Sequence, residues 1–317
     1  MTLASLARGR SKAKPGPGPT PQALLRALDV TVGRRIRGLV PGEYRAHDLG
    51  GGTELAQVRP YQPGDDVRRI DWNVTARTTV PHVRIHVPER ALTTWLVLDC
   101  SASMTFGTAD RRKADVAEGV AVAMGHIATQ RGNRLGIVTF GGRSDRRLAA
   151  RGGRDGLLAV LLTSRNEGDE DDAGNGDVAV RPAASLESAL KFVAAAAIRG
   201  GLVALVSDFR GPRDWRRPLA AVAARHHVLA IEIRDPREDL LPDVGDLTLV
   251  DAESGRQVRV DTSSRRLRER FQEAAGADRA SLTADLRRLG VGHVVLSTSG
   301  SWLRSLAAQL RVLGIAS

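Results

Sequence analysis

The sequence has few of the features that mark exported or membrane-spanning proteins. Its 317 residues include one cysteine, Cys100, so no internal disulfide can form and a reducing, cytoplasmic setting is expected. No stretch approaches the roughly 18 uninterrupted apolar residues that a membrane-spanning helix needs. We therefore expect a cytoplasmic chain without a transmembrane segment. Its net charge of +11 leaves peripheral docking on an acidic membrane surface open.

Aromatic residues are also scarce, at 3% of the chain, which leaves little material for stacking nucleic-acid bases. The net charge of +11 would suit phosphate contacts, but the arginines are spread along the whole sequence instead of forming one block. This distribution favours an arginine-rich solvated surface. Binding to nucleic acid or to an acidic surface is kept as a second alternative function.

Three motifs of catalysis are missing from the sequence. There is no GxxxxGK[ST] cradle for nucleotide phosphates, no GxSxG elbow for a nucleophilic serine and no HExxH pair of zinc ligands. We expect no enzymatic activity from this chain, and any step driven by ATP would come from a partner.

The composition divides the chain into three parts. Residues 1–21 are basic, free of acidic residues and rich in proline and glycine, which predicts a disordered tail. Residues 22–90 begin with a helical periodicity over 22–39 and continue as a small β-containing module, with strand-like runs at 54–61 and 83–87. Residues 91–317 form the largest part.

This largest part alternates apolar strands with amphipathic helices. Five continuous runs are typical of strands buried on both faces of a parallel sheet: TWLVLD, RLGIVTF, GLVALVSDF, HVLAIEI and GHVVLST. Helices are predicted over residues 113–130, 154–163, 186–198, 213–225, 265–289 and 302–313. Strand and crossover helix in repetition predict a doubly wound α/β fold with a mainly parallel sheet. Two segments depart from this alternation of strands and helices: an acidic loop over 166–177 and a hairpin over 247–261.

Acidic and hydroxyl side chains lie where two of these strands end. Asp99 closes the first run, Ser101 and Ser103 follow it at alternating positions, and Asp208 closes the third run. Ligands of open α/β sheets bind beyond the carboxyl ends of the strands, so these oxygens converge if the two strands are neighbours. Hard oxygen donors of this kind suit Mg²⁺ or Mn²⁺. The alternative is that they cap the following turn or helix.

The pattern D-x-S-x-S with a later strand-ending Asp resembles the metal-ion-dependent adhesion site of von Willebrand factor A domains. More of the chain, from about Leu24 to Leu313, resembles domain-of-unknown-function family 58. The segments that carry this likeness are RPYQPGDDVRRIDWNVTART, LVLDCSASM, LVSDF and LVDAESGRQVRVDT. The resemblance implies a von Willebrand factor A-like α/β domain with a small N-terminal β-containing module. It also implies a MoxR-type AAA ATPase as partner, in the assembly or maturation of a client complex.

The adhesion-site pattern implies metal ligands at Asp99, Ser101, Ser103 and Asp208, but one expected donor differs. That pattern has a threonine in an intervening loop, and Ala184 stands at its position here. The neighbouring Ser185 is either a substitute donor or the N-cap of the helix that begins at Leu186.

The first hypothesis is thus a non-enzymatic interaction protein that engages its partner through a Mg²⁺-dependent face. An alternative is a metal-dependent phosphoesterase in which Asp65 or Asp66 assists. Those two residues and Asp71 lie among Arg68, Arg69 and Arg77, a mixture of charges that favours a structural ion-pair lattice.

Overall fold

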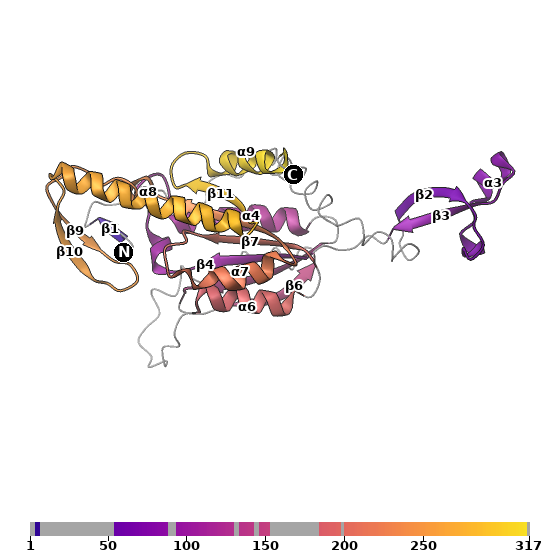
Figure 1. Cartoon of the computed structure of the whole chain (residues 1–317), viewed down its shortest axis with the longest axis horizontal. Helices are drawn as coiled ribbons and strands as arrows, with labels where there is room; N and C mark the ends of the chain where they lie inside the picture. The colour runs from indigo at the N-terminus through magenta and orange to yellow at the C-terminus, as the bar shows by residue number, and fades with distance from the viewer. Residues whose placement is uncertain are drawn as a thin grey trace. The chain divides into compact units, whose positions relative to one another are not determined.

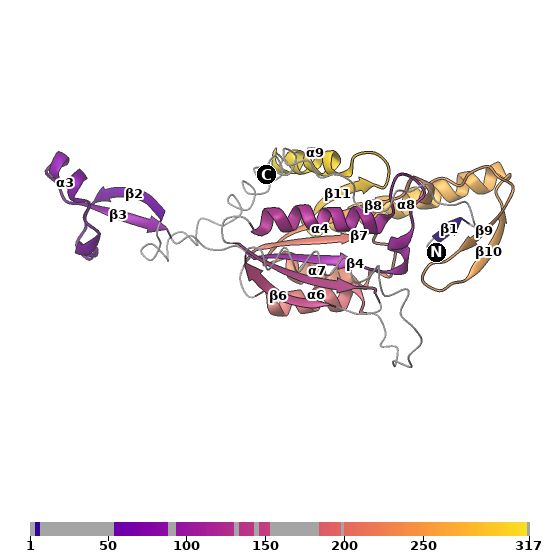
Figure 2. The same ribbon diagram turned by 180° about the vertical axis from the view of Figure 1, so that it is seen from behind.

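The computed structural model describes residues 4–6, 54–87, 93–129, 133–142, 146–152, 184–197 and 200–315. The chain divides into two compact units, one comprising Arg37–Ala91 and the other Met1–Ile36 together with Leu92–Ser317. Figures 1 and 2 show both units from opposite sides. The helices predicted over 22–39 and 154–163 and the acidic loop over 166–177 lie outside the described residues.

The smaller unit is built on an antiparallel strand pair. Its elements are β2 (Glu54–Pro60), the short 3₁₀ helix η1 (Val67–Arg69), α3 (Trp72–Thr78) and β3 (His82–Val87). The two strands were expected, whereas α3 was not. It forms because the Asp71 carboxylate caps its first turn, accepting hydrogen bonds from the backbone N–H groups of Asn73 and Val74 at 3.0 and 3.2 Å.

Asp71 also ties this helix to β3, and its titration offers a first test. Arg84 lies 2.8 Å from the carboxylate, and this hydrogen-bonded pair lowers the pKa of Asp71 to about 2. A lowered pKa means that the ionised carboxylate stabilises the unit above about pH 4. That contribution disappears as the pH falls toward 2. In an NMR titration of the Asp71 carboxyl carbon we expect a midpoint near 2.

Replacing Arg84, the ion-pair partner of Asp71, supplies the control for this titration. Arg84→Gln removes the positive charge, so the Asp71 midpoint should rise toward the ordinary value of about 3.9. A wild-type midpoint already at that value would show that the pair is not formed in solution.

The larger unit contains a six-stranded sheet in the order β11-β8-β7-β4-β5-β6. Its strands are β4 (Thr93–Asp99), β5 (Arg134–Phe140), β6 (Arg147–Gly152), β7 (Leu202–Ser207), β8 (His227–Arg234) and β11 (Gly292–Ser297). All neighbouring pairs are parallel except β5 with β6. The five predicted strands are confirmed, as is the mainly parallel α/β sheet. β6 was not predicted, because this edge strand has little of the apolar character of a buried strand.

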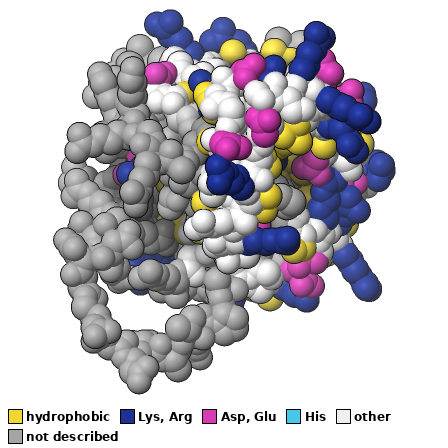
Figure 3. Space-filling model, turned by 90° about the vertical axis from the view of Figure 1, so that its left-hand side faces the viewer, with side chains coloured by type: hydrophobic (Ala, Val, Ile, Leu, Met, Phe, Trp, Pro, Cys, Tyr) yellow, Lys and Arg dark blue, Asp and Glu magenta, His cyan; other side chains and the backbone are white. Residues whose placement is uncertain are grey.

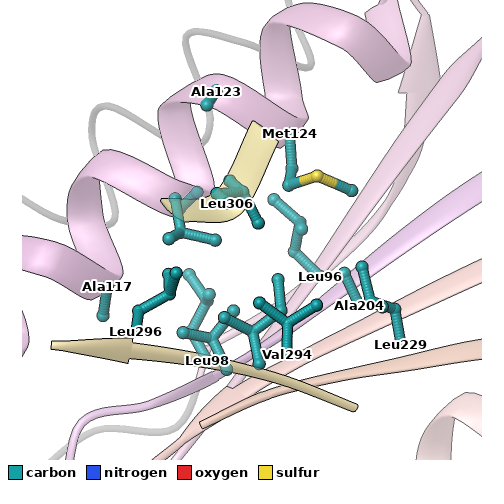
Figure 4. Packing of buried hydrophobic residues seen from close by; sticks show 14 of the residues in the cluster. Leu96, Leu98, Ala117, Ala123, Met124, Ala204, Leu229, Val294, Leu296 and Leu306 are labelled. Atoms are coloured by element: carbon teal, nitrogen blue, oxygen red, sulfur yellow. The ribbon is translucent and has the colours of Figure 1, made fainter. Parts of the chain in front are cut away.

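Helices cover both faces of this sheet. α4 (Lys113–Thr129) and α9 (Trp302–Ile315) pack on one face, and α6 (Leu186–Ala196), α7 (Arg216–Ala223) and α8 (Arg265–Arg288) pack on the other. Along β4, Leu96 and Leu98 enter the first core while Trp95 and Val97 enter the second. Figure 4 shows the first core, where Met124 of α4 and Leu306 of α9 face the sheet. Burial on both faces explains the uninterrupted apolar runs.

A second, three-stranded sheet lies beside this fold. The predicted hairpin is formed by β9 (Asp246–Val250) and β10 (Gln257–Asp261), and β1 (Ala4–Leu6) adds to β9. The sequence predicts a disordered tail at 1–21, so β1 is a difference from that expectation. An edge strand offers unpaired N–H and C=O groups, and a short extended segment can satisfy them without a recognisable apolar pattern.

Among the described residues no helix is long and apolar enough to cross a membrane.

Candidate metal centre

The candidate site lies where the connections of the main sheet diverge. β4 pairs in parallel with β5 on one side and with β7 on the other, so its carboxyl end opens a crevice between crossovers that run in opposite directions. Asp99 ends β4, and Asp208 follows directly after β7. The sequence predicts that Asp99 and Asp208 converge if their strands are neighbours. β4 and β7 are neighbours, so this condition is met.

Asp99 is buried at this strand end, and each of its two oxygens accepts a hydrogen bond. Its Oδ1 accepts from the backbone N–H of Ser101 at 2.9 Å, and its Oδ2 accepts from the hydroxyl of Ser207 at 2.5 Å. Burial raises the pKa of Asp99 to about 6, and the charge of nearby Asp208 adds to the rise, whereas the bonds from the two serines lower it. Holding this carboxylate ionised is thus costly without a nearby cation.

The hydroxyls of Ser101 and Ser103 lie together beside this carboxylate. Their Oγ atoms are hydrogen-bonded to each other at 3.0 Å. Two oxygens bound at about 2.1 Å to one Mg²⁺ ion, at right angles to each other, would be separated by about 3.0 Å. Ser101 is the N-cap of η2 (Ala102–Thr105) but makes no side-chain capping bond, so its hydroxyl is not used in the capping role considered as the alternative.

Asp208 is held by a buried lysine. The Nζ atom of Lys113 is 2.6 Å from Asp208 Oδ2 and 2.6 Å from Glu238 Oε1, and Lys113 is completely buried. Asp208 Oδ1 accepts from the Arg210 backbone N–H at 2.9 Å. Each carboxylate oxygen has two lone pairs, so Asp208 retains acceptor capacity. Its charge, however, is already shared with an internal cation.

Ser185 acts as a helix cap. Its side chain accepts from the backbone N–H of Ser188 at 3.2 Å, at the start of α6. The adjoining Ala184 lies close to the serine loop, because its carbonyl accepts from the Gly141 backbone N–H at 2.9 Å. A Cβ atom built on Gly141 would lie 2.8 Å from Ser101 Cβ. The segment that contains Ala184 therefore passes next to the site. The methyl group of Ala184 stands where the adhesion-site pattern has a threonine hydroxyl.

Three polar residues of this site were missed by the sequence reasoning. Lys113 carried a usable signal, because a cation in the first turn of a helix opposes the helix dipole and needs a nearby anion. Glu238 and Glu253 carried none, since their proximity depends on long-range packing. Glu253 Oε1 accepts from the Ser103 backbone N–H at 3.1 Å. Among the described residues no three His, Cys, Asp or Glu side chains form a metal cluster, so a cation here depends on the serine hydroxyls.

The carboxylates of the smaller unit have structural partners, and its two side-chain ion pairs involve arginines other than those named from the sequence. Asp65 pairs with Arg59 of β2 at 2.8 Å, and Asp71 pairs with Arg84. Asp66 caps η1 through the Arg68 backbone N–H. The Asp71–Arg84 pair thus depends on the position of β3, whereas Asp65 and Asp66 find their partners nearby in the chain.

Comparison with known proteins places the chain in a family. Residues 57–281 match the family described as "Protein of unknown function DUF58". The chain belongs to the DUF58 family. Uncharacterized proteins of Mycobacterium bovis and Mycobacterium tuberculosis are each 43% identical to this DUF58 protein over 286 residues, covering 90% of this chain and 87% of the relative.

Two solved structures are more distant from this DUF58 protein. The conserved hypothetical protein BatB from Bacteroides thetaiotaomicron is 12% identical with a TM-score of 0.42, covering 72% of this chain and 100% of that one. An aerotolerance-related membrane protein from Bacteroides fragilis is 10% identical with the same TM-score and coverage. These two structures are too distant to establish the fold of the DUF58 chain. Its fold follows from its own sheet order.

The surface around the second sheet is charged. Figure 3 views the larger unit from the side that carries β9 and β10, and it shows Lys and Arg side chains interspersed with Asp and Glu. Several arginines of α8 are paired, including Arg268 with Asp243 and Arg279 with Asp239. A mixed distribution of this kind keeps a basic chain well solvated.

Proposed function

We propose that this DUF58 protein is a non-enzymatic interaction protein with a von Willebrand factor A-like domain. In this proposal Asp99, Ser101 and Ser103 hold Mg²⁺ or Mn²⁺ at the carboxyl end of β4, and the cation binds an acidic side chain of a partner. The observation that carries the proposal is the gathering of two serine hydroxyls, hydrogen-bonded to each other at 3.0 Å, beside a buried carboxylate at the divergence point of the sheet.

The residues fit a hard divalent cation. All the donors are oxygens, and a dication would offset the repulsion between Asp99 and Asp208 that adds to the raised pKa of Asp99. Asp208 would act mainly through its charge, because Lys113 already holds one of its oxygens. Ser185 is left out of the ligand set, since its hydroxyl caps α6. When bound, the cation would supply an open coordination position for a carboxylate.

Cation binding is tested by calorimetric titration of the full chain with Mn²⁺ and Mg²⁺. We expect one site in the wild type. Asp99→Ala removes the central carboxylate and should lower the affinity by about two orders of magnitude or more. Ser103→Ala should weaken binding less, since water can replace one hydroxyl.

Ser185→Ala is the matched control for this titration. It removes a serine hydroxyl from the neighbouring segment and should cost about 1 kcal/mol of stability through the lost N-cap. Its Mn²⁺ affinity should equal that of the wild type. A wild-type protein that binds neither cation, or an Asp99→Ala variant that binds as well as the wild type, would overturn the proposed site.

The partner we propose is a MoxR-type AAA ATPase, acting with this protein on a client complex. This part rests on the resemblance of the sequence and on the need of such a site for an acidic partner group. In a pull-down with the purified ATPase, binding should be lost in EDTA and in Asp99→Ala. Binding that persists under both conditions would separate the partnership from the cation face.

A further inference from the structure

The β9–β10 hairpin brings a carboxylate to the candidate site from 150 residues away in sequence. Glu253 lies in the hairpin turn, and its Oε1 accepts from the Ser103 backbone N–H at 3.1 Å. Ser103 is buried, whereas Glu253 is exposed. An accessible acidic side chain of this same chain therefore reaches the residue whose hydroxyl belongs to the proposed cation site.

The turn presents this side chain in a defined way. The Asp251 carboxylate accepts from the backbone N–H groups of Glu253 and Ser254 at 3.0 and 3.3 Å. The Gly255 N–H donates to the Asp251 carbonyl at 2.8 Å, and Gly255 has a φ of +67°, a conformation natural to glycine. Hydrogen bonds within the turn thus hold the backbone of Glu253, while its side chain extends to the neighbouring loop.

A simple capping role explains only part of this contact. Ser101 makes no side-chain capping bond to η2, so the Ser103 N–H needs another acceptor, and any acceptor would satisfy it. Glu253 adds a carboxylate to a strand edge where Lys113 compensates Asp208 but where Asp99 has no ion-pair partner among the described residues, and like charges repel. A divalent cation beside the serine hydroxyls would turn that repulsion into attraction.

We propose that the Glu253 carboxylate is the chain's own ligand at the open position of the cation. A partner's acidic side chain then binds the cation by displacing Glu253. The β9–β10 hairpin thereby controls access to the open coordination position. This inference rests on the proposed function and deepens it, because it identifies what the partner must compete with.

Water-proton relaxation by bound Mn²⁺ tests this role, because each water molecule on the ion adds to the relaxation rate. Glu253→Gln keeps an oxygen that can accept from Ser103 N–H but removes the charged ligand. In this variant we expect the relaxivity to rise by the contribution of one bound water, and the Mn²⁺ affinity to fall on the order of tenfold. Acetate should displace that water at about tenfold lower concentration than in the wild type.

Glu273→Gln, at an exposed position of α8, is the control and should behave as the wild type in all three measurements. If the wild type binds Mn²⁺ and Glu253→Gln has the same relaxivity, affinity and acetate response, Glu253 is only a cap and the inference is wrong. If the wild type binds no Mn²⁺, the cation site and the inference fail together.

Discussion

Lys113→Met is expected to destabilise the α/β unit by about 3–5 kcal/mol, because it leaves two buried carboxylates without their cation. The Lys113 side chain is completely buried and lies 2.6 Å from both Asp208 and Glu238. Burial lowers the pKa of Lys113, but the two carboxylates outweigh burial and the net shift is upward. The ammonium is thus charged in the folded protein, and methionine of similar length cannot replace its charge.

Lys191→Met is the matched control. Lys191 also pairs with a carboxylate, Glu187 at 2.7 Å, but its side chain is 66% exposed. Pairs exposed to solvent contribute roughly 0–1 kcal/mol, so this variant should unfold almost as the wild type does. If both lysine variants lost the same small amount of stability, the buried ammonium would not be essential to the fold.

Denaturant unfolding followed by tryptophan fluorescence provides the measurement, since Trp95, Trp215 and Trp302 are buried in this unit. Adding Asp208→Asn to Lys113→Met removes one of the uncompensated charges. The double variant should therefore recover part of the lost stability. A double variant less stable than Lys113→Met alone would contradict this account of the cost.

Gly141→Ala is expected to give the second large effect, which combines lost stability with a weakened site. Gly141 has a φ of +79°, where a residue with a Cβ is strained, and the added atom would lie 2.8 Å from Ser101 Cβ. Backbone strain of this kind costs about 1–3 kcal/mol, and the contact adds to it. Since Ser101 must move to relieve the contact, we expect Mn²⁺ affinity to fall by about 10- to 100-fold.

Gly245→Ala separates the effect of backbone strain from the effect of the contact with Ser101. Gly245 has a similar φ of +71°, but an added Cβ would meet nothing within 4 Å. This variant should therefore show the backbone strain without any change in Mn²⁺ affinity. Calorimetric titration and denaturant unfolding of the two variants measure both quantities. Equal Mn²⁺ affinities in the two variants would show that Gly141 does not position Ser101.

Much of the α/β unit was predictable because its signals are local. The five apolar runs become parallel strands, since burial on both faces leaves no polar position along them. The hairpin over 247–261 also carries its own signal in Gly255. The edge strand β6 and the helix α3 were missed, because one carries charged side chains to solvent and the other depends on a single capping residue, Asp71.

By itself, the sequence determined the family, the α/β class and the serine and aspartate positions that end β4 and follow β7. The tertiary structure alone decided what surrounds them. It paired β4 with β7, placed Lys113 between Asp208 and Glu238, and brought Glu253 to Ser103. These side-chain contacts join residues 95 to 150 positions apart. Such partners are selected by sheet order and by the need to compensate buried charge, and neither leaves a periodic trace in the chain.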